Sequence, residues 1–319
     1  MAEIIYLNGH LLPRSKARLS PFDHGFLYGY GLFETMRAYR GDIFRLDRHL
    51  SRLYRSAEAL GLARGVIASP SLPLRVTKGV SLRAKRSNLT SLRINSAKQS
   101  LEAACRETLE ANRLKEARVR LTVSAGEGDI IPDPSSCSAP TVLVTARSFT
   151  PPGAEEYERG FKATLSSLRR DSQSPLSRLK STSYLANVLA RREARAAGGD
   201  EGIVLNEKGC LAEGSTSNIF LVSQGVLVTP SLESGILPGI TREAVLEIAR
   251  CLNIAAAERE VGLAELTQAE EAFVTSSLLE IMPLTSFDGK AIGAGKPGGL
   301  TRKLMAAYKK LVDESLSRA

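Results

Sequence analysis

Residues 175–190 read Pro-Leu-Ser-Arg-Leu-Lys-Ser-Thr-Ser-Tyr-Leu-Ala-Asn-Val-Leu-Ala, and they place Lys180 at the mouth of a predicted amphipathic helix. Residues 212–220, Ala-Glu-Gly-Ser-Thr-Ser-Asn-Ile-Phe, set Glu213 before small residues and a strand. A desolvated lysine can form a Schiff base, and a carboxylate against a pyridine nitrogen keeps that nitrogen protonated. The pair favours pyridoxal phosphate chemistry. On spacing alone, the simpler interpretation is two solvated surface groups.

Two further turns offer groups that bind phosphate. Leu237 to Arg242 places Pro and Gly before a predicted helix, whose first backbone amides lack partners within the helix. The run Thr275-Ser-Ser277 follows an apolar strand and offers more amides and hydroxyls. Each turn taken singly is also read as an ordinary cap. Together with Lys180 and Glu213, the turns indicate one cofactor site.

Six stretches in a fixed order make the sequence resemble the class IV aminotransferases. They include Ser20-Pro-Phe-Asp-His-Gly-Phe-Leu-Tyr-Gly-Tyr-Gly-Leu-Phe-Glu-Thr-Met-Arg37, and the others are residues 44–53, Lys180 with its helix, 213–218, 237–242 and 273–281. This family of fold type IV pyridoxal-phosphate enzymes contains branched-chain aminotransferases, D-amino-acid aminotransferases and aminodeoxychorismate lyases. The resemblance implies a two-domain α/β (α+β) enzyme with pyridoxal 5′-phosphate in the cleft between the domains, and usually a homodimer.

The resemblance also implies a role for individual residues. Lys180 is the Schiff-base lysine and catalytic proton carrier, and Glu213 is the partner of the pyridine nitrogen. Tyr184, which is expected one helical turn after Lys180 and on the same face, bonds the phenolic oxygen of the cofactor. The phosphate is expected to be bound by Arg52, by the backbone amides of Ile240 and Thr241, and by Ser276 and Ser277.

Recognition of the substrate is less sharply indicated. Tyr28, Phe33, Arg37 and Arg120 align with positions that shape the pocket of branched-chain enzymes, although the aromatic residues are equally read as core. The run Ser124-Ala-Gly-Glu-Gly128 lacks the Arg-x-His pair of D-amino-acid aminotransferases. The best-supported reactions are transamination of a branched-chain or similar amino acid with 2-oxoglutarate, and the lyase reaction that yields 4-aminobenzoate and pyruvate from aminodeoxychorismate. D-amino-acid transamination remains an alternative.

Length and composition are those of a two-domain globular protein. The chain has 319 residues, 43% hydrophobic and 24% charged. The turn-rich connection 148–153 predicts domains over 1–148 and 154–319. The stretch Met1-Ala-Glu-Ile does not have the pattern of a signal peptide, and no apolar run reaches about 20 residues, so we expect no membrane association. The four cysteines form no C-x-x-C pair, which predicts reduced thiols in a cytoplasm, and the three histidines make a metal site unexpected.

The net charge of +9 has a local origin. Between Glu58 and Glu102 the sequence contains eight Lys or Arg residues and no acid, which leaves 9 − 8 = +1 for the rest of the chain. The Ser- and Arg-rich stretch 63–98 is read as an inserted, largely disordered loop, with a basic docking site as the alternative. A nucleic-acid-binding protein on an enzyme scaffold is the alternative from another functional class, but the local charge favours a small-molecule enzyme without nucleic acid.

Periodicity predicts alternating strands and helices. Strands are expected over 4–12 and 31–45, with Asn8-Gly9 as a turn, and a helix over 46–60. Further helices are expected over 101–114, 182–197, 239–252 and 299–315. Further strands are expected over 119–123, 141–145, 161–168, 202–206, 217–222, 226–229 and 271–275.

Overall fold

The computed structural model describes residues 2–62 and 100–317, and these residues form two compact units. The first unit comprises Met1–Thr150 together with Lys180–Ser183, and the second comprises Pro151–Leu179 and Tyr184–Ala319. The four residues that begin with Lys180 therefore belong with the first unit, which the sequence did not indicate. The predicted insert over 63–98 lies outside the described residues.

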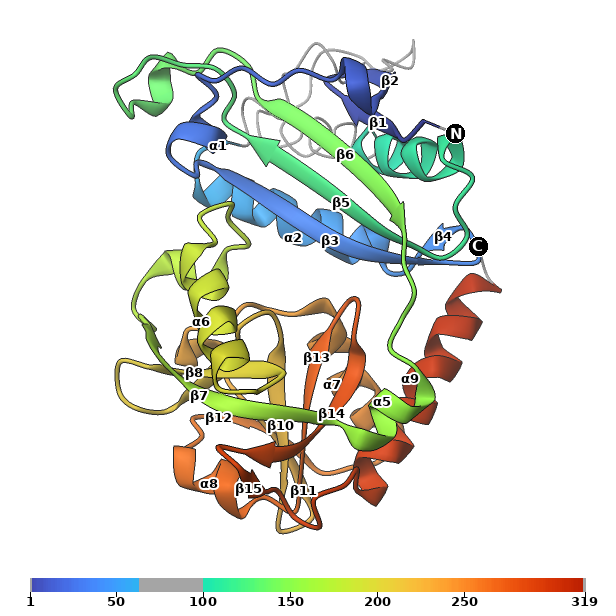
Figure 1. Ribbon diagram of the computed structural model, residues 1–319, viewed down its shortest axis with the longest axis vertical. Helices are drawn as coiled ribbons and strands as arrows, with labels where there is room; N and C mark the ends of the chain where they lie inside the picture. The colour runs from blue at the N-terminus through green and yellow to red at the C-terminus, as the bar shows by residue number, and fades with distance from the viewer. Residues whose placement is uncertain (1, 63–99, 318–319) are drawn as a thin grey trace, which may run out of the picture. The chain divides into compact units, whose positions relative to one another are not determined.

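The first unit is built on a six-stranded antiparallel sheet (Figure 1). Its strands follow the order β2-β1-β6-β5-β3-β4. Their bounds are β1 (Ile4–Leu7), β2 (His10–Pro13), β3 (Gly31–Tyr39), β4 (Asp42–Ile43), β5 (Ala117–Ser124) and β6 (Thr141–Ser148). Asn8 and Gly9 both adopt positive φ, 47° and 93°. Two such residues match the twist of a tight hairpin, so the predicted turn joins β1 to β2.

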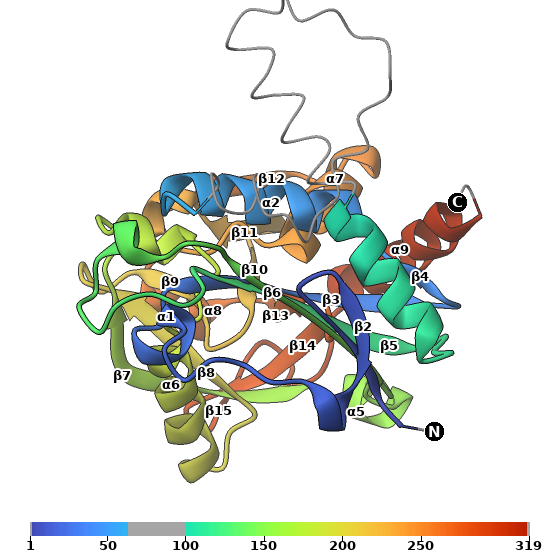
Figure 2. The same ribbon diagram turned by 90° about the horizontal axis from the view of Figure 1, so that it is seen from above.

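Helices cover one side of this sheet. The predicted helix over 46–60 forms as α2 (Leu46–Ala59), and it buries Leu46, Leu50 and Leu53 at helical spacing. Figure 2 shows α2 and the helix over 100–111 along the same side of the strands. The short helix α1 (His24–Leu27) precedes β3. Its N-cap residue is Asp23, whose carboxylate accepts from the Gly25 amide at 2.7 Å.

The second unit contains a nine-stranded mixed sheet. The order is β12-β11-β10-β13-β14-β7-β8-β9, with β15 paired to β14. The strands are β7 (Phe161–Arg170), β8 (Glu201–Asn206), β9 (Leu211–Gly214), β10 (Asn218–Ser223), β11 (Val226–Pro230), β12 (Ala256–Arg259), β13 (Glu271–Ser276), β14 (Glu280–Phe287) and β15 (Lys290–Ala291). The helices are α5 (Ala154–Arg159), α6 (Leu185–Ala196), α7 (Ile240–Cys251), α8 (Leu263–Gln268) and α9 (Gly299–Leu316).

The predicted elements of this unit form, and the sequence missed several strands. β9 is four residues long and ends in Glu-Gly, so it lacks a strand pattern. β14 lies inside the sheet although it contains Pro283, and a proline in a run argues against a central strand. Side chains of the inner strands, among them Ile219, Leu221 and Val274, form the buried core on which the loops of the candidate site stand.

Candidate active site

Lys180 is held by backbone pairing with β3 of its own unit. The Phe33 amide donates to the Lys180 carbonyl at 2.9 Å, and the Thr182 amide donates to the Gly31 carbonyl at 2.8 Å. The Lys180 Nζ lies 4.8 Å from the centroid of the Phe33 ring. Strand pairing therefore fixes the backbone that carries the amine and places the amine over an aromatic face.

The predicted helical face that joins Lys180 to Tyr184 does not form, and that prediction is wrong. Helix α6 begins at Leu185, with Tyr184 as its N-cap residue. Before Tyr184 the chain is bonded to β3 in an extended geometry. Because a four-residue step brings side chains together only within a helix, this spacing does not place Tyr184 over Lys180.

Three of the predicted substrate residues share one face of the first sheet. The guanidinium carbon of Arg120, on β5, lies 3.9 Å from the same Phe33 ring that Lys180 contacts. Side chains alternate along a strand, so Arg37 projects from the same face of β3 as Phe33. Arg37 stacks on Tyr39, with its guanidinium carbon 4.3 Å from the ring centroid. This face is thus basic and aromatic.

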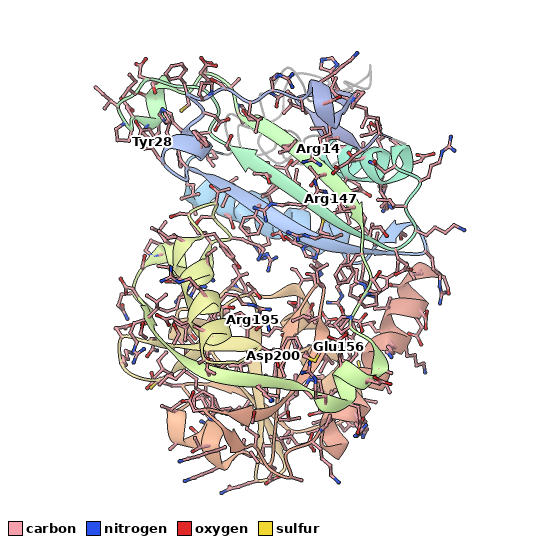
Figure 3. The ribbon with its side chains drawn as sticks, in the orientation of Figure 1. Arg14, Tyr28, Arg147, Glu156, Arg195 and Asp200 are labelled. Atoms are coloured by element: carbon pink, nitrogen blue, oxygen red, sulfur yellow. The ribbon has the colours of Figure 1, made fainter. Side chains whose placement is uncertain are left out.

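Tyr28 lies at the end of α1, where its ring meets the His24 ring edge-on at a centroid distance of 4.9 Å (Figure 3). About 40% of Tyr28 is exposed, so it is not a core residue. The structure places it on a surface loop of the first unit.

A buried ionic cluster lies on the opposite face of β3. Glu34 is fully buried, and both of its oxygens accept from Arg52 of α2, at 2.8 Å from Nε and 2.6 Å from Nη2. His49, one turn earlier on α2, bonds the same carboxylate through Nδ1 at 2.7 Å. Sequence reasoning assigned Arg52 to the cofactor phosphate and missed Glu34. Nothing in a single sequence marks one strand carboxylate as the partner of a helix arginine.

Protonation in this cluster follows from burial and charge together. Burial raises the pKa of Glu34, but the charges of Arg52 and His49 and their hydrogen bonds outweigh it and lower the pKa to about 2. Burial lowers the pKa of His49 against the opposing effect of Glu34. An ionised carboxylate only accepts hydrogen bonds, so the Nδ1–H of His49 donates to Glu34.

Glu213 is the centre of a second cluster, in the second unit. The side chain of Glu213, on β9, is 4% exposed, and one of its oxygens accepts from the Leu237 amide at 3.0 Å and from Asn218 Nδ2 at 3.3 Å. Its other oxygen forms an ion pair with Arg170 at the end of β7. Glu213 thus has a donor on each of its two oxygens. Arg170 and Asn218 were not predicted as site residues.

Hydrogen bonds to Glu201 hold the turn after Glu213 in place. Glu201, fully buried on β8, accepts from the Ser215 amide at 3.0 Å and from the Ser217 hydroxyl at 2.9 Å. Asn187 of α6 donates to the Ser215 carbonyl at 2.8 Å. These hydrogen bonds hold the small residues after Glu213 in a fixed turn. The sequence did not indicate this role for Glu201, because Glu201 and the turn are far apart in the chain and meet only when β8 and β9 pair.

The predicted phosphate turns both lie in the second unit. Helix α7 starts at Ile240 after the N-cap Gly239, and no side chain caps its first amides. Ser276 ends β13, and its hydroxyl accepts from the Leu279 amide at 3.2 Å. The hydroxyl of Thr275 is buried and has no hydrogen-bond partner among the described residues. Uncapped helix amides and an unsatisfied buried hydroxyl are features that a bound anion can satisfy.

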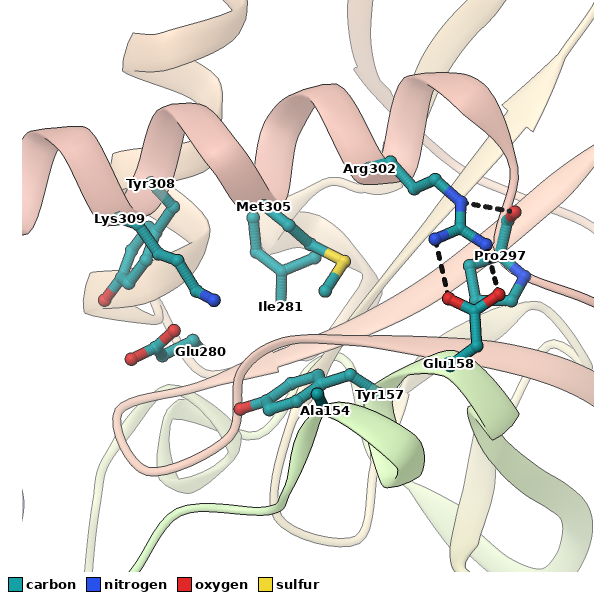
Figure 4. A pocket seen from close by; sticks show the side chains of 10 residues that line it. All are labelled: Ala154, Tyr157, Glu158, Glu280, Ile281, Pro297, Arg302, Met305, Tyr308 and Lys309. Carbon is teal, nitrogen blue, oxygen red and sulfur yellow. Dashed lines mark hydrogen bonds and ion pairs between the residues drawn. The ribbon is translucent and has the colours of Figure 1, made fainter.

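A separate cavity of about 180 Å³ lies between α5, β14 and α9 of the second unit (Figure 4). Tyr157, Ile281 and Met305 line its apolar part, and the bidentate Arg302–Glu158 pair closes one end. None of the predicted site residues lines this cavity. Within residues 2–62 and 100–317 there is no cluster of His, Cys, Asp or Glu that could hold a metal ion. No helix in the same ranges has the length and apolarity to cross a membrane.

Comparison with known proteins identifies the family. The model of the family described as Amino-transferase class IV matches residues 31–287. The chain belongs to the class IV aminotransferases. It is 36% identical over 305 residues to a putative branched-chain-amino-acid aminotransferase of Methanocaldococcus jannaschii, covering 96% of this chain and 95% of that protein. It is 35% identical over 309 residues to aminodeoxychorismate lyase of Bacillus subtilis, covering 96% and 94%.

The fold agrees with that membership. The crystal structure of Escherichia coli branched-chain amino acid aminotransferase superimposes with a TM-score of 0.83 at 29% identity, covering 98% of this chain and 95% of that one. This class IV aminotransferase is therefore a fold type IV enzyme. The family uses pyridoxal 5′-phosphate, and another branched-chain aminotransferase of this fold has been solved with pyridoxamine 5′-phosphate.

The residues of the chain fit that cofactor. Pyridoxal 5′-phosphate needs an amine, an acid for the pyridine nitrogen and donors for a phosphate. The chain contains groups of each kind: the amine of Lys180 in the first unit, and in the second unit the buried carboxylate of Glu213, the uncapped start of α7 and the unsatisfied Thr275 hydroxyl. The sequence-based expectation of pyridoxal phosphate is confirmed.

Proposed function

We propose that Lys180 and Glu213 act on one cofactor as its Schiff-base lysine and its pyridine-nitrogen partner. The observation that carries this proposal is the buried Glu213 carboxylate, which accepts from Leu237 and Asn218 and is paired with Arg170. An ionised carboxylate in that setting holds a proton on a pyridine nitrogen. The remaining roles are proposed as the resemblance implies them: Arg52, Ile240, Thr241, Ser276 and Ser277 for the phosphate, and Tyr184 for the phenolic oxygen.

The reaction then depends on the lysine amine. When bound, pyridoxal 5′-phosphate supplies an electron sink for the charge that develops at the substrate Cα. With the cofactor held, Lys180 Nζ would be the base that accepts the proton from the substrate Cα and the acid that gives it up again. The pairing of residues 180–182 with β3 limits the motion of the backbone, so the amine moves about its own side-chain torsions.

We propose transamination between a branched-chain or similar amino acid and 2-oxoglutarate as the reaction. Arg120 and Arg37 lie on the sheet face that also carries Phe33, which Lys180 contacts. A guanidinium binds carboxylate through two hydrogen bonds, and 2-oxoglutarate carries two carboxylates. An aromatic floor suits an apolar side chain. The names of the relatives from Methanocaldococcus jannaschii and Escherichia coli agree with this substrate class.

Aminodeoxychorismate cleavage is the second candidate. It is favoured by the 35% identity to the Bacillus subtilis lyase, almost as high as that to the putative branched-chain enzyme. Both reactions start with proton removal from Cα, so Lys180 and Glu213 serve either one. Purified holoenzyme incubated with leucine and 2-oxoglutarate should form glutamate much faster than it forms 4-aminobenzoate from aminodeoxychorismate. The reverse order of rates would assign the lyase reaction instead.

We propose that the enzyme is a homodimer in the cytoplasm. Exposed apolar side chains gather on two neighbouring loops of the first unit, where Phe22 and Phe26 face solvent with Ile130 and Ile131. The Gly128 amide donates to the Phe22 carbonyl at 3.3 Å, which ties the two loops together. Large apolar side chains grouped on a surface are typical of an interface. The thiol of Cys105 is buried and forms no disulfide, which agrees with a reducing compartment.

A further inference from the structure

Asn218, the first residue of β10, lies where three segments of the second unit meet. It is 5% exposed, and its side-chain amide donates to two acceptors, the Glu213 carboxylate at 3.3 Å and the Leu237 carbonyl at 2.9 Å. The Leu237 amide in turn donates to the same Glu213 oxygen at 3.0 Å. Asn218, Glu213 and the backbone of Leu237 therefore form a closed ring of hydrogen bonds.

This ring is tied directly to the start of α7. Leu237 stands three residues before Ile240, the first residue of the helix. Gly239 packs against the asparagine so closely that a Cβ there would lie 1.9 Å from Asn218 Oδ1. Gly239 has an ordinary φ of −72°, so the close approach and not the backbone angle requires glycine. The position of α7 relative to Glu213 is thus set through Asn218.

The second phosphate turn is tied to the same residue. In the β10–β13 ladder, Asn218 is the register partner of Thr275, whose neighbour Ser276 ends β13. The buried hydroxyl of Thr275 is the one that lacks a partner among the described residues. One asparagine therefore links the proposed pyridine anchor to both proposed phosphate turns.

We propose that Asn218 is a positioning residue that sets the spacing between the pyridine anchor and the phosphate turns, and thereby makes binding selective for the phosphorylated cofactor. This inference rests on the proposed roles of Glu213 and of the α7 start. A ligand that bonds both ends gains the full free energy of each bond only when their separation is held in advance. A ligand without phosphate bonds the pyridine end alone and gains little from that spacing.

The test measures binding by the apoenzyme of pyridoxal 5′-phosphate and of pyridoxal, which lacks the phosphate. Asn218→Ala should lower the ratio of the two affinities by roughly tenfold or more, since two buried hydrogen bonds are lost and each contributes about a factor of two to ten. The matched control is Asn206→Ala. Asn206 is a fully buried asparagine of the same unit whose side chain accepts from the amides of Lys208 and Cys210. Its loss should leave the ratio unchanged.

A second variant perturbs the same contact from the other side. Gly239→Ala should also lower the affinity ratio, because the new Cβ displaces the Asn218 side chain. In the double variant Asn218→Ala with Gly239→Ala that clash is absent, so the double variant should match Asn218→Ala alone. Additive losses, or equal losses of affinity for both ligands, would overturn the inference, because a merely structural asparagine lowers both affinities together. Circular dichroism of each apoenzyme confirms that the compared variants are folded.

Failure of the proposed function gives a different pattern. If Glu213 is not the pyridine partner, Glu213→Gln leaves kcat and the absorbance of the bound cofactor unchanged. If only the role of Asn218 is wrong, Glu213→Gln changes both, whereas Asn218→Ala keeps the selectivity for phosphate.

Discussion

At the scale of single residues, the proposed function rests on Lys180 and Glu213. Lys180→Ala should abolish turnover and the visible absorbance of lysine-bound cofactor, because the pairing of residues 180–182 with β3 presents this one amine over Phe33. Absorbance spectra and borohydride reduction followed by peptide mapping check this. Lys162→Ala, which changes an exposed lysine of β7, serves as the control and should behave as wild type. A reduced adduct in Lys180→Ala would remove Lys180 from its role.

Glu213 should act on the chemical step rather than on the retention of cofactor. Glu213→Gln keeps the size of the side chain but removes the charge that holds a proton on the pyridine nitrogen. We expect kcat to fall by at least about a hundredfold, in line with the loss of a group that is matched to the transition state. Stopped-flow kinetics at saturating cofactor measure this fall. An undiminished kcat with cofactor bound would place the pyridine partner elsewhere.

At the scale of elements, the buried ion pair between Arg52 and Glu34 holds α2 against β3. Glu34→Gln leaves Arg52 buried without its full counter-charge, so the free energy of unfolding should fall by about 3–5 kcal/mol at pH 7. Urea unfolding of both proteins at several pH values measures the difference. As a control, Glu3→Gln removes the exposed pairs with Arg14 and Arg147 and should cost less than about 1 kcal/mol.

The pH dependence of that difference has a defined sign. The folded-state pKa of Glu34 is about 2, below the ordinary value of 4.5, so its ionised form stabilises the fold. This contribution is complete above pH 4.5 and is lost as the pH falls from about 4.5 to about 2. The stabilities of wild type and Glu34→Gln should therefore converge over that window. A difference that stays constant down to pH 2 would contradict the ionic origin.

At the scale of the whole molecule, the exposed apolar side chains around Phe26 and Ile130 predict a homodimer. Replacing Phe26 and Ile130 by serine together should shift the protein from dimer to monomer, since each is more than 70% exposed in the single chain. Light scattering after size exclusion gives the mass. Leu176→Ser, which changes an exposed leucine of the second unit, is the control and should leave the mass unchanged. A monomeric wild type would refute the dimer proposal.

The family, the cofactor and most strands and helices could be predicted from the sequence, because these depend on the local order of residues. The periodic apolar pattern of α2 or α9 predicts a helix without knowledge of its partners in the fold. The stretches around Lys180 and Glu213 are recognised by their order in the sequence alone. The prediction was wrong where the backbone forms hydrogen bonds with a distant strand instead of with the next helical turn. The helix predicted over 182–197 begins only at Leu185, because the residues before it pair with β3, and Tyr184 therefore does not lie on the predicted helical face.

Which polar groups form hydrogen bonds with one another could not be predicted before the fold was known. Glu34, Arg170 and Asn218 look like ordinary polar residues in the sequence, and their partners stand 18, 43 and 5 to 19 positions away. A buried charge or amide must be satisfied, and which group satisfies it depends on sheet register and helix placement. Hydrogen bonds form only between groups that the fold brings within about 3 Å of each other. The folded chain therefore determines that Arg52 binds Glu34 and that Glu213 bonds to the segment before α7.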